Sequence, residues 1–106
     1  MSELKKEITS QHSLLLELQH ILESELHLIS TRDAESLINL LKTKEVLLDS
    51  VQQQDSLIAS LYAKASQDER DDEELSSLFD EAKLMVTQCQ FRTKINQTAV
   101  EQGQLR

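Results

Sequence analysis

Residues 23–51 read ESELHLISTRDAESLINLLKTKEVLLDSV, and this stretch joins two leucine-rich patterns through a short polar break. Within the break, Ser30, Thr31 and Asp33 carry short side chains that can accept a hydrogen bond from the free amides at a helix start. Ser30 with Asp33 resembles a capping box. We therefore expect a tight turn here, and because short connections favour antiparallel neighbours, we expect the two leucine-rich segments to fold back on each other as helices.

The pattern before the break predicts a helix over residues 3–30, with Ser2 as its N-cap. Its apolar residues step by threes and fours or by whole heptads, which places them on one stripe: Leu4, Ile8, Leu15, Leu18, Leu22 and Ile29. A second row lies beside the first and consists of Leu14, Ile21 and Leu28. The combined face is wider than a two-stranded coiled-coil seam, so this helix should contact two neighbours.

After the break, a second helix is expected over residues 33–65. Its buried face should consist of Leu37, Leu41, Leu48, Val51, Ile58, Leu61 and Tyr62. Residues 66–74, SQDERDDEE, contain no apolar side chain, which indicates a solvated connection. Its acidic end suits the positive pole of a third helix, expected over residues 72–102. The stripe of this helix comprises Leu75, Leu78, Phe79, Ala82, Met85, Val86, Cys89, Asn96, Ala99 and Val100.

Composition agrees with this all-α reading. The 106 residues include nineteen Leu, one Gly, no Pro and three aromatic side chains, which leaves little from which to build strands and tight turns. The predicted fold is a single domain of 1–106: an elongated, antiparallel three-helix bundle of the coiled-coil type, running up, down and up.

Charge and hydropathy narrow the classes of partner. The formal net charge of -8 disfavours nucleic acid and anionic membrane surfaces. The longest apolar runs, such as Leu14–Leu16, are three residues long, far short of the roughly 20 residues of a membrane span. The N-terminal residues also lack a signal-peptide core, so we expect a cytoplasmic protein.

Residues that could carry chemistry are few. Glu17 and His20 form a Glu-x-x-His pair of the kind used in di-iron bundles, but those sites need a second such pair, which the sequence lacks. We interpret His20, like His12 and His27, as an ordinary surface or boundary histidine. The acidic run 68–74 lacks the glycine and spaced oxygen ligands of a calcium loop. We expect no metal and no cofactor.

Cys89 is the only cysteine, so it has no partner in the chain for a disulfide. Free cysteine packs well as a small apolar side chain, whereas a nucleophile needs a nearby base in an electropositive setting. The surrounding helix offers Lys83 and Arg92 but no histidine. We therefore predict that Cys89 packs in the core. The sequence also contains no glycine-rich phosphate loop and no nucleophile elbow, so it does not indicate an enzyme.

Asn96 interrupts the third apolar stripe with an amide, which costs stability unless the amide is hydrogen-bonded. Two readings stay open: an asparagine that sets the register of the core, or one that contacts a partner. Beyond Phe91 the stripe thins to Ile95, Ala99, Val100 and Leu105. A weakly packed amphipathic helix is a suitable place for docking a partner helix, although simple fraying also explains residues 103–106.

The break and the helix after it resemble the FlgN family of flagellar export chaperones. The positions that match the pattern of this family are Glu25, Leu28, Asp33, Leu37, Leu40, Leu41, Lys44, Leu47 and Leu48. The family's third helix carries an Asn-x-x-Asn motif followed by two apolar residues and Glu, and here Asn96 precedes Ala99, Val100 and Glu101. Thr93 replaces the first asparagine, and Gln97 replaces the usual glycine. Family members usually continue further, which implies a trimmed or naturally short form.

The resemblance implies a cytoplasmic chaperone that binds the C-terminal helical segments of the hook-filament junction proteins FlgK and FlgL. Such a chaperone keeps its clients unpolymerised and delivers them to the flagellar type III export apparatus. Carried over to this sequence, the client contacts are Asn96, Ala99 and Val100, and we extend them along the stripe to Val86 and Cys89. The alternative is a structural helical module that oligomerises through the same stripes, and a homodimer is compatible with either.

Overall fold

The computed structural model describes residues 2–104, and every regular element in that range is helical. The elements are α1 (Glu3–Thr31), α2 (Ala34–Lys64), α3 (Gln67–Arg70), α4 (Glu73–Ala99) and a π-helical turn, η1 (Val100–Gln104), that continues α4. The prediction of an all-α helical bundle is confirmed. The bundle measures 56 × 20 × 17 Å, because at 1.5 Å per residue the 31 residues of α2 alone span about 46 Å. Leu105, the last apolar residue of the sequence, lies outside the described residues.

The turn between α1 and α2 is closed by Arg32 in the left-handed conformation, with φ 60°. The backbone N–H groups of Arg32 and Asp33 donate to Ile29 O at 3.2 Å and to Leu28 O at 3.1 Å. The Asp33 carboxylate then caps α2 by accepting from the Ser36 N–H at 3.1 Å. Ser30 lies inside α1, so the capping box predicted at Ser30 is wrong: α1 continues one residue past its predicted end, to Thr31, and Arg32 ends it in the left-handed conformation.

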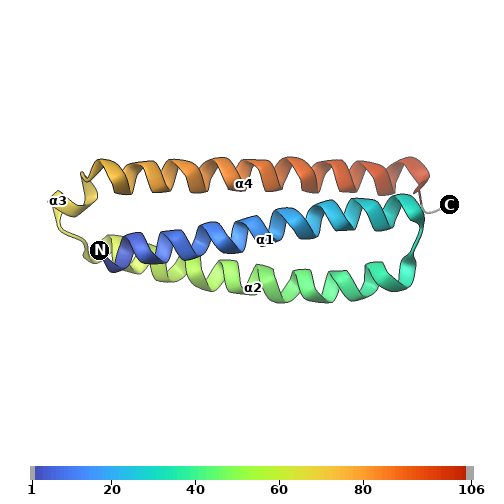
Figure 1. Ribbon diagram of the computed structural model, residues 1–106, viewed down its shortest axis with the longest axis horizontal. Helices are drawn as coiled ribbons and strands as arrows, with labels where there is room; N and C mark the ends of the chain where they lie inside the picture. The colour runs from blue at the N-terminus through green and yellow to red at the C-terminus, as the bar shows by residue number, and fades with distance from the viewer. Residues whose placement is uncertain (1, 105–106) are drawn as a thin grey trace.

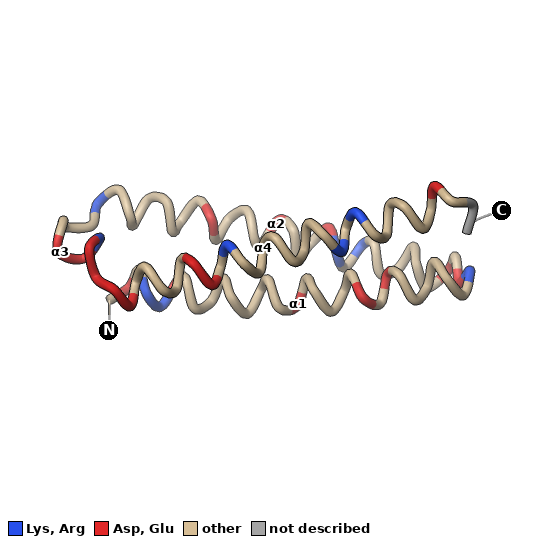
Figure 2. The backbone as a smooth tube through the Cα atoms, turned by 90° about the horizontal axis from the view of Figure 1, so that it is seen from above, with Lys and Arg blue, Asp and Glu red and all other residues tan. Residues whose placement is uncertain are grey.

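The acidic connection contains one short helix, α3, that the sequence did not indicate. Arg70 ends this helix and donates to the last carbonyls of α2, from Nε to Tyr62 O at 3.2 Å and from Nη2 to Ala63 O at 2.9 Å. Asp72 caps α4 and forms an ion pair with Lys5 at the start of α1. Figure 2 shows a cluster of acidic residues at α3 and at the beginning of α4. The connection thus ties all three long helices together at this end.

The helix α1 lies between α2 and α4 and packs along both (Figure 1), as the width of its apolar face predicted. Its buried residues alternate steps of three and four: Leu4, Ile8, Gln11, Leu15, Leu18, Leu22, Glu25 and Ile29. In contrast, α2 buries only Leu47 and Ile58, and α4 only Leu75, Cys89 and Asn96, among the described residues. The core is therefore built around α1.

The helices α2 and α4 approach each other less closely than either approaches α1, although Ile58 and Leu47 of α2 share buried clusters with Leu75 and Cys89 of α4. As a result, three side chains of the expected buried face of α2, namely Leu41, Leu48 and Tyr62, belong to the exposed class. The prediction that they are buried is wrong, because α4 approaches α2 less closely than α1 does and leaves part of the apolar face of α2 uncovered.

Candidate functional site

The space between α2 and α4 forms an open groove whose floor is the buried stripe of α1. We call it the α2–α4 groove. It contains two hollows. The first, near α3, comprises two adjoining cavities of about 520 and 490 Å³ that share Asp55, Ile58, Phe79 and Lys83. The second, near the end of α4, has a volume of about 440 Å³. We call them the Tyr62 hollow and the Val100 hollow after one exposed residue in each.

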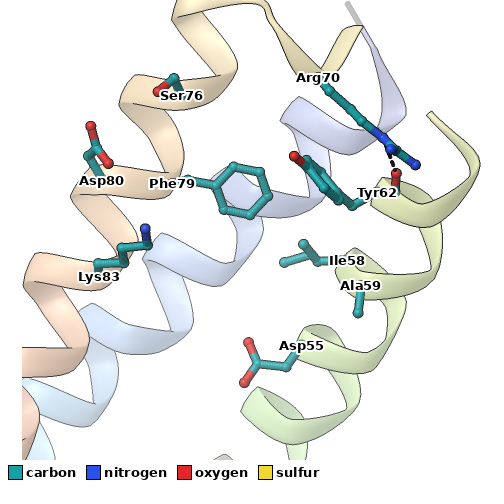
Figure 3. Close-up of a pocket in the computed structure, with 9 residues that line it drawn as sticks. All are labelled: Asp55, Ile58, Ala59, Tyr62, Arg70, Ser76, Phe79, Asp80 and Lys83. Atoms are coloured by element: carbon teal, nitrogen blue, oxygen red, sulfur yellow. Dashed lines mark hydrogen bonds between the residues drawn. The ribbon is translucent and has the colours of Figure 1, made fainter. Parts of the chain in front are cut away.

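The Tyr62 hollow lies between apolar side chains of α2 and α4, with α1 behind them (Figure 3). Tyr62 and Phe79 meet edge to face, with ring centroids 5.6 Å apart and planes at 87°. The guanidinium of Arg70 lies 5.1 Å from the centre of the Tyr62 ring, a cation–π geometry. These contacts close the groove next to α3, while Ile58 and Ala59 line it further along.

The floor of the Tyr62 hollow carries one polar pair, formed by Gln11 of α1 and Asp55 of α2. Gln11 is only 4% exposed, and its Nε2 donates to the Asp55 carboxylate. Its other amide atom, Oε1, has no hydrogen-bond partner within residues 2–104. Partial burial of the Asp55 carboxyl raises its pKa. The pair therefore joins a buried glutamine of α1 to an exposed aspartate of α2 beside a hollow whose surface is largely apolar.

A waist of buried side chains separates the two hollows. It consists of Leu18, Leu22, Leu47 and Cys89. The Cys89 thiol donates to Leu15 O at 3.7 Å, and the core reading of this residue is confirmed. Burial raises the pKa of Cys89, and nearby Arg92 lowers it by less. Because the thiolate is the reactive form, the structure gives Cys89 neither the access nor the charge state of a nucleophile.

The Val100 hollow has an apolar side formed by Ile29, Leu37, Leu41 and Val100. Leu41 is 43% exposed and Val100 is 39% exposed, so these two side chains stand open on opposite walls. Val100 is the C-cap of α4 and the first residue of η1, which contacts α1. The hollow therefore offers apolar surface on three helical elements at once.

A polar layer crosses the bundle directly beside the Val100 hollow. The buried Glu25 carboxylate accepts from Lys44 Nζ of α2 at 3.0 Å and from Asn96 Nδ2 of α4 at 2.6 Å. Asn96 Nδ2 also donates to Leu22 O at 3.0 Å. A buried carboxylate is tolerated only when it is paired and hydrogen-bonded, and both conditions are met here. The layer links α1, α2 and α4 through one side chain from each.

The five client contacts expected from the sequence occupy three different environments. Val86 lines the Tyr62 hollow and Val100 lines the Val100 hollow, both on the open side of α4. Asn96 borders the Val100 hollow but is only 3% exposed, which matches the core role that its position left open. Cys89 is buried in the waist. Ala99 borders a shallow depression elsewhere on α4, with Phe91 and Ile95.

The sequence reasoning missed the polar residues of the groove floor. Gln11 and Glu25 occupy regular positions of the α1 stripe, between Ile8 and Leu15 and between Leu22 and Ile29. A polar residue at a position of the apolar stripe could have identified both of them, as it identified Asn96. Their spacing of two heptads corresponds to about 21 Å along the helix.

The groove presents mainly apolar surface with a few hydrogen-bonding groups, which is the chemistry of binding another helix. No group of three or more metal-ligating side chains occurs in the described part of the chain, and both Glu17 and His20 are exposed.

None of the helices in residues 2–104 combines the length and apolarity needed to cross a membrane. Comparisons of the chain with protein-family models, with curated proteins and with solved structures produced no match.

Proposed function

We propose that this chain is a helix-binding protein that takes an amphipathic helix of a partner into the α2–α4 groove. In this proposal the chain is an antiparallel up-down-up three-helix bundle of the coiled-coil type, and the partner adds a fourth helix. The observation that carries the proposal is the pair of hollows floored by α1, where side chains such as Leu41 and Val100 remain exposed. A groove between helices is a common binding mode for amphipathic helices.

The preferred partner class comes from the resemblance to the FlgN family. Its matched positions Glu25, Lys44 and Asn96 meet in one polar layer beside the Val100 hollow, which supports the idea that they act together. We therefore propose a cytoplasmic export chaperone for the hook-filament junction proteins FlgK and FlgL. It would cover their C-terminal helices, prevent premature self-assembly and deliver them to the type III export apparatus, without catalysis and without a cofactor.

The physical basis of the proposed chaperone action is burial of apolar surface. A free amphipathic helix exposes a stripe that favours self-association, and exposed apolar patches mark sites of association or aggregation. Each leucine moved from water into the groove contributes about 1.5–3 kcal/mol before the cost of association is subtracted. The same contact would cover the exposed residues of the groove walls, so apolar surface of both partners would be removed from water.

The direct test is binding of a synthetic peptide that corresponds to the C-terminal helix of a flagellar junction protein, measured by calorimetry with the full chain. Val100→Asp and Leu41→Asp place a charge on opposite walls of the Val100 hollow, and each should weaken binding at least about tenfold. Helicity should be retained, because both positions are already solvent-exposed. Thr98→Asp, an exposed position outside the groove, is the matched control. Absence of binding at micromolar peptide would contradict the proposal.

A second candidate function, a structural oligomerisation module, is favoured by one observation. The exposed side chains Leu84, Phe91 and Ile95 form an apolar row on α4, and a depression of about 450 Å³ lies beside Phe91 and Ile95. Two copies that pair through this row would bury it. Analytical ultracentrifugation of the chain and of Phe91→Glu separates the candidates, since a dimer that Phe91→Glu dissociates, combined with no peptide binding, supports the structural module.

A further inference from the structure

We propose that the apolar row of α4, formed by Leu84, Phe91 and Ile95, is the interface of an antiparallel homodimer. In this dimer Leu84 of each copy packs against Phe91 of the other, and Asp80 of each copy pairs with Lys94 of the other. The inference gives the row a partner, a direction and a register. It does not depend on what the α2–α4 groove binds, because the row lies on a different side of α4.

The apolar row lies on the side of α4 that faces away from the core. Its members follow one another at spacings of seven and four residues, which places them on one face of the helix. Cys89, on the buried face, is five residues from Leu84, which corresponds to about 140° around the helix. The helix α4 forms one edge of the bundle (Figure 1). Leu84 is therefore 58% exposed and Phe91 is 65% exposed, so burial of these side chains requires another molecule.

The charges of α4 are divided by sign along the helix. Residues 73–81 contain four acidic residues and no basic one, whereas residues 82–99 contain three basic residues and no acidic one. Figure 2 shows this change of sign along α4. Two parallel copies would place like charges side by side, but two antiparallel copies place the acidic part of each beside the basic part of the other. The charge pattern therefore favours a second copy as the partner, in the antiparallel direction.

The apolar and charged contacts agree on one register. In an antiparallel pair, residues that face each other are equally far from the two-fold axis, on opposite sides of it. Leu84 faces Phe91 when the axis passes midway between positions 87 and 88, and Asp80 faces Lys94 when it passes at position 87. These two positions of the axis differ by only about 0.8 Å along the helix. One alignment therefore satisfies both kinds of contact.

Asp80 and Lys94 are placed to form this contact. Counted from Leu84, they lie about 40° and about 80° to the same side of the row, as a two-fold pair requires. Both side chains are exposed, and neither forms an ion pair within residues 2–104. In contrast, Arg92 on the other side of the row already pairs with Glu23 of α1 at 3.1 Å. Charge pairs at the rim of an interface contribute more to specificity than to affinity, so the Asp80–Lys94 contacts would mainly set direction and register.

The interface is short, which determines how strongly the copies associate. From Leu84 to Ile95 the row spans about 16 Å of helix. Contacts of this size are typical of weak, reversible complexes, so we expect dimers at concentrations of about 100 µM rather than an obligate dimer. Each copy keeps its own α2–α4 groove, so the dimer would present two grooves.

Sedimentation equilibrium of the full chain, at concentrations up to about 500 µM and at low ionic strength, measures the dimerisation. Phe91→Glu should weaken it at least about tenfold, because the charge would be buried against Leu84 of the other copy. Val46→Glu on α2, at a position that is 68% exposed, is the matched control and should leave the dimer unchanged. Circular dichroism of each variant verifies that the bundle is folded.

Charge reversals test the Asp80–Lys94 contact. Asp80→Lys and Lys94→Glu each turn two attractive contacts of the dimer into repulsive ones, so each should weaken dimerisation about fivefold at low ionic strength. An equimolar mixture of the two variants should dimerise again, because every contact of the mixed pair joins opposite charges. Lys42→Glu, at an exposed position of α2, controls for the change in net charge and should have no such effect.

Disulfide crosslinking reads the direction and the register. Ser77 and Thr98 are both exposed and lie equally far from the axis between positions 87 and 88, on opposite sides of it. A mixture of Ser77→Cys and Thr98→Cys chains should therefore crosslink on mild oxidation. Neither variant should crosslink with itself, because its two thiols would be about 32 Å apart along the dimer. Cys89 is buried and is common to all the chains.

A dimer that Phe91→Glu dissociates, that the mixture of charge variants restores and that crosslinks only in the mixed cysteine pair supports the inference. A chain that stays monomeric throughout, a dimer that Phe91→Glu leaves intact, or crosslinking of Thr98→Cys with itself overturns it. The proposed function is tested separately by peptide binding to Phe91→Glu, which should match that of the parent chain. Loss of dimerisation with retained peptide binding therefore leaves the helix-binding groove standing.

Discussion

The side-chain amide of Asn96 donates to the Glu25 carboxylate across 2.6 Å, although the two residues are 71 positions apart in the sequence. With Lys44 on the other carboxylate oxygen, at 3.0 Å, this contact joins all three long helices in one layer. Apolar side chains can slide past one another, whereas a buried polar layer permits only the alignment that satisfies it. The layer therefore sets the relative height of α1, α2 and α4 and, with it, the shape of the Val100 hollow.

Removal of the amide should destabilise the bundle measurably. Asn96→Ala deletes two buried hydrogen bonds, one of them to a charged group, and we expect the free energy of unfolding to fall by about 2–3 kcal/mol. Urea denaturation followed by circular dichroism measures this loss. Gln90→Ala, at an exposed position of the same helix, should change stability by no more than about 0.5 kcal/mol. Equal losses in the two variants would contradict a structural role for the layer.

Lys44, the lysine of the polar layer, should contribute more to the stability of the fold than its neighbours on α2 do. Lys44→Met leaves the buried Glu25 carboxylate without its cation, and we expect a loss of about 1–3 kcal/mol. Lys42→Met, an exposed position two residues away, is the matched comparison and should be close to neutral. Combining Lys44→Met with Glu25→Leu should recover part of the loss, because no uncompensated charge then remains buried. If the double variant is no better than the single one, the carboxylate is not the source of the loss.

The left-handed residue between α1 and α2 offers a stabilising substitution. Arg32 has φ 60° and ψ 34°, a conformation that is unfavourable for any residue with a β-carbon. Arg32→Gly should raise stability by up to about 1 kcal/mol, whereas Arg32→Ala, which keeps the β-carbon, should show no such gain. Thermal unfolding of both variants measures the difference. A gain with alanine as large as that with glycine would assign the effect to loss of the charge.

The free energy of unfolding should depend on pH through the titration of Asp55. Burial raises the pKa of this carboxyl from its ordinary value of 3.8, so the folded chain holds this proton more tightly than the unfolded chain does. The stabilising contribution is therefore fully present below pH 3.8 and is lost as the pH rises through the raised pKa. Asp55→Asn cannot titrate, so its stability relative to the parent chain should increase with pH across this window.

Urea denaturation at a series of pH values from 3 to 7 tests this expectation. Asp49→Asn, at an exposed position of α2, controls for the removal of one negative charge and should show no such pH-dependent gain. An Asp55→Asn curve that runs parallel to that of the parent chain over the whole range would show that burial does not perturb this carboxyl.

Much of the architecture follows from the sequence alone. The heptad spacing of the first stripe, from Leu4 to Ile29, predicts a long helix with a broad apolar face, and the break at residues 30–33 predicts where the chain turns. These features are local: helical periodicity depends only on residue spacing, and capping depends on side chains within one turn. The core position of Cys89 was predicted on the same basis, from its place on a stripe.

The groove is a different kind of property, because only the tertiary structure decides it. A stripe that contains Leu41 and Tyr62 shows that a helix has an apolar face, but not which part of that face a neighbour covers. Coverage depends on how closely α2 and α4 approach, and the central position of α1 keeps them apart. Likewise, the partners of Gln11 and Glu25 come from helices distant in the sequence. Neither the unpaired oxygen of Gln11 nor the satisfied carboxylate of Glu25 can therefore be predicted before the helices are placed side by side.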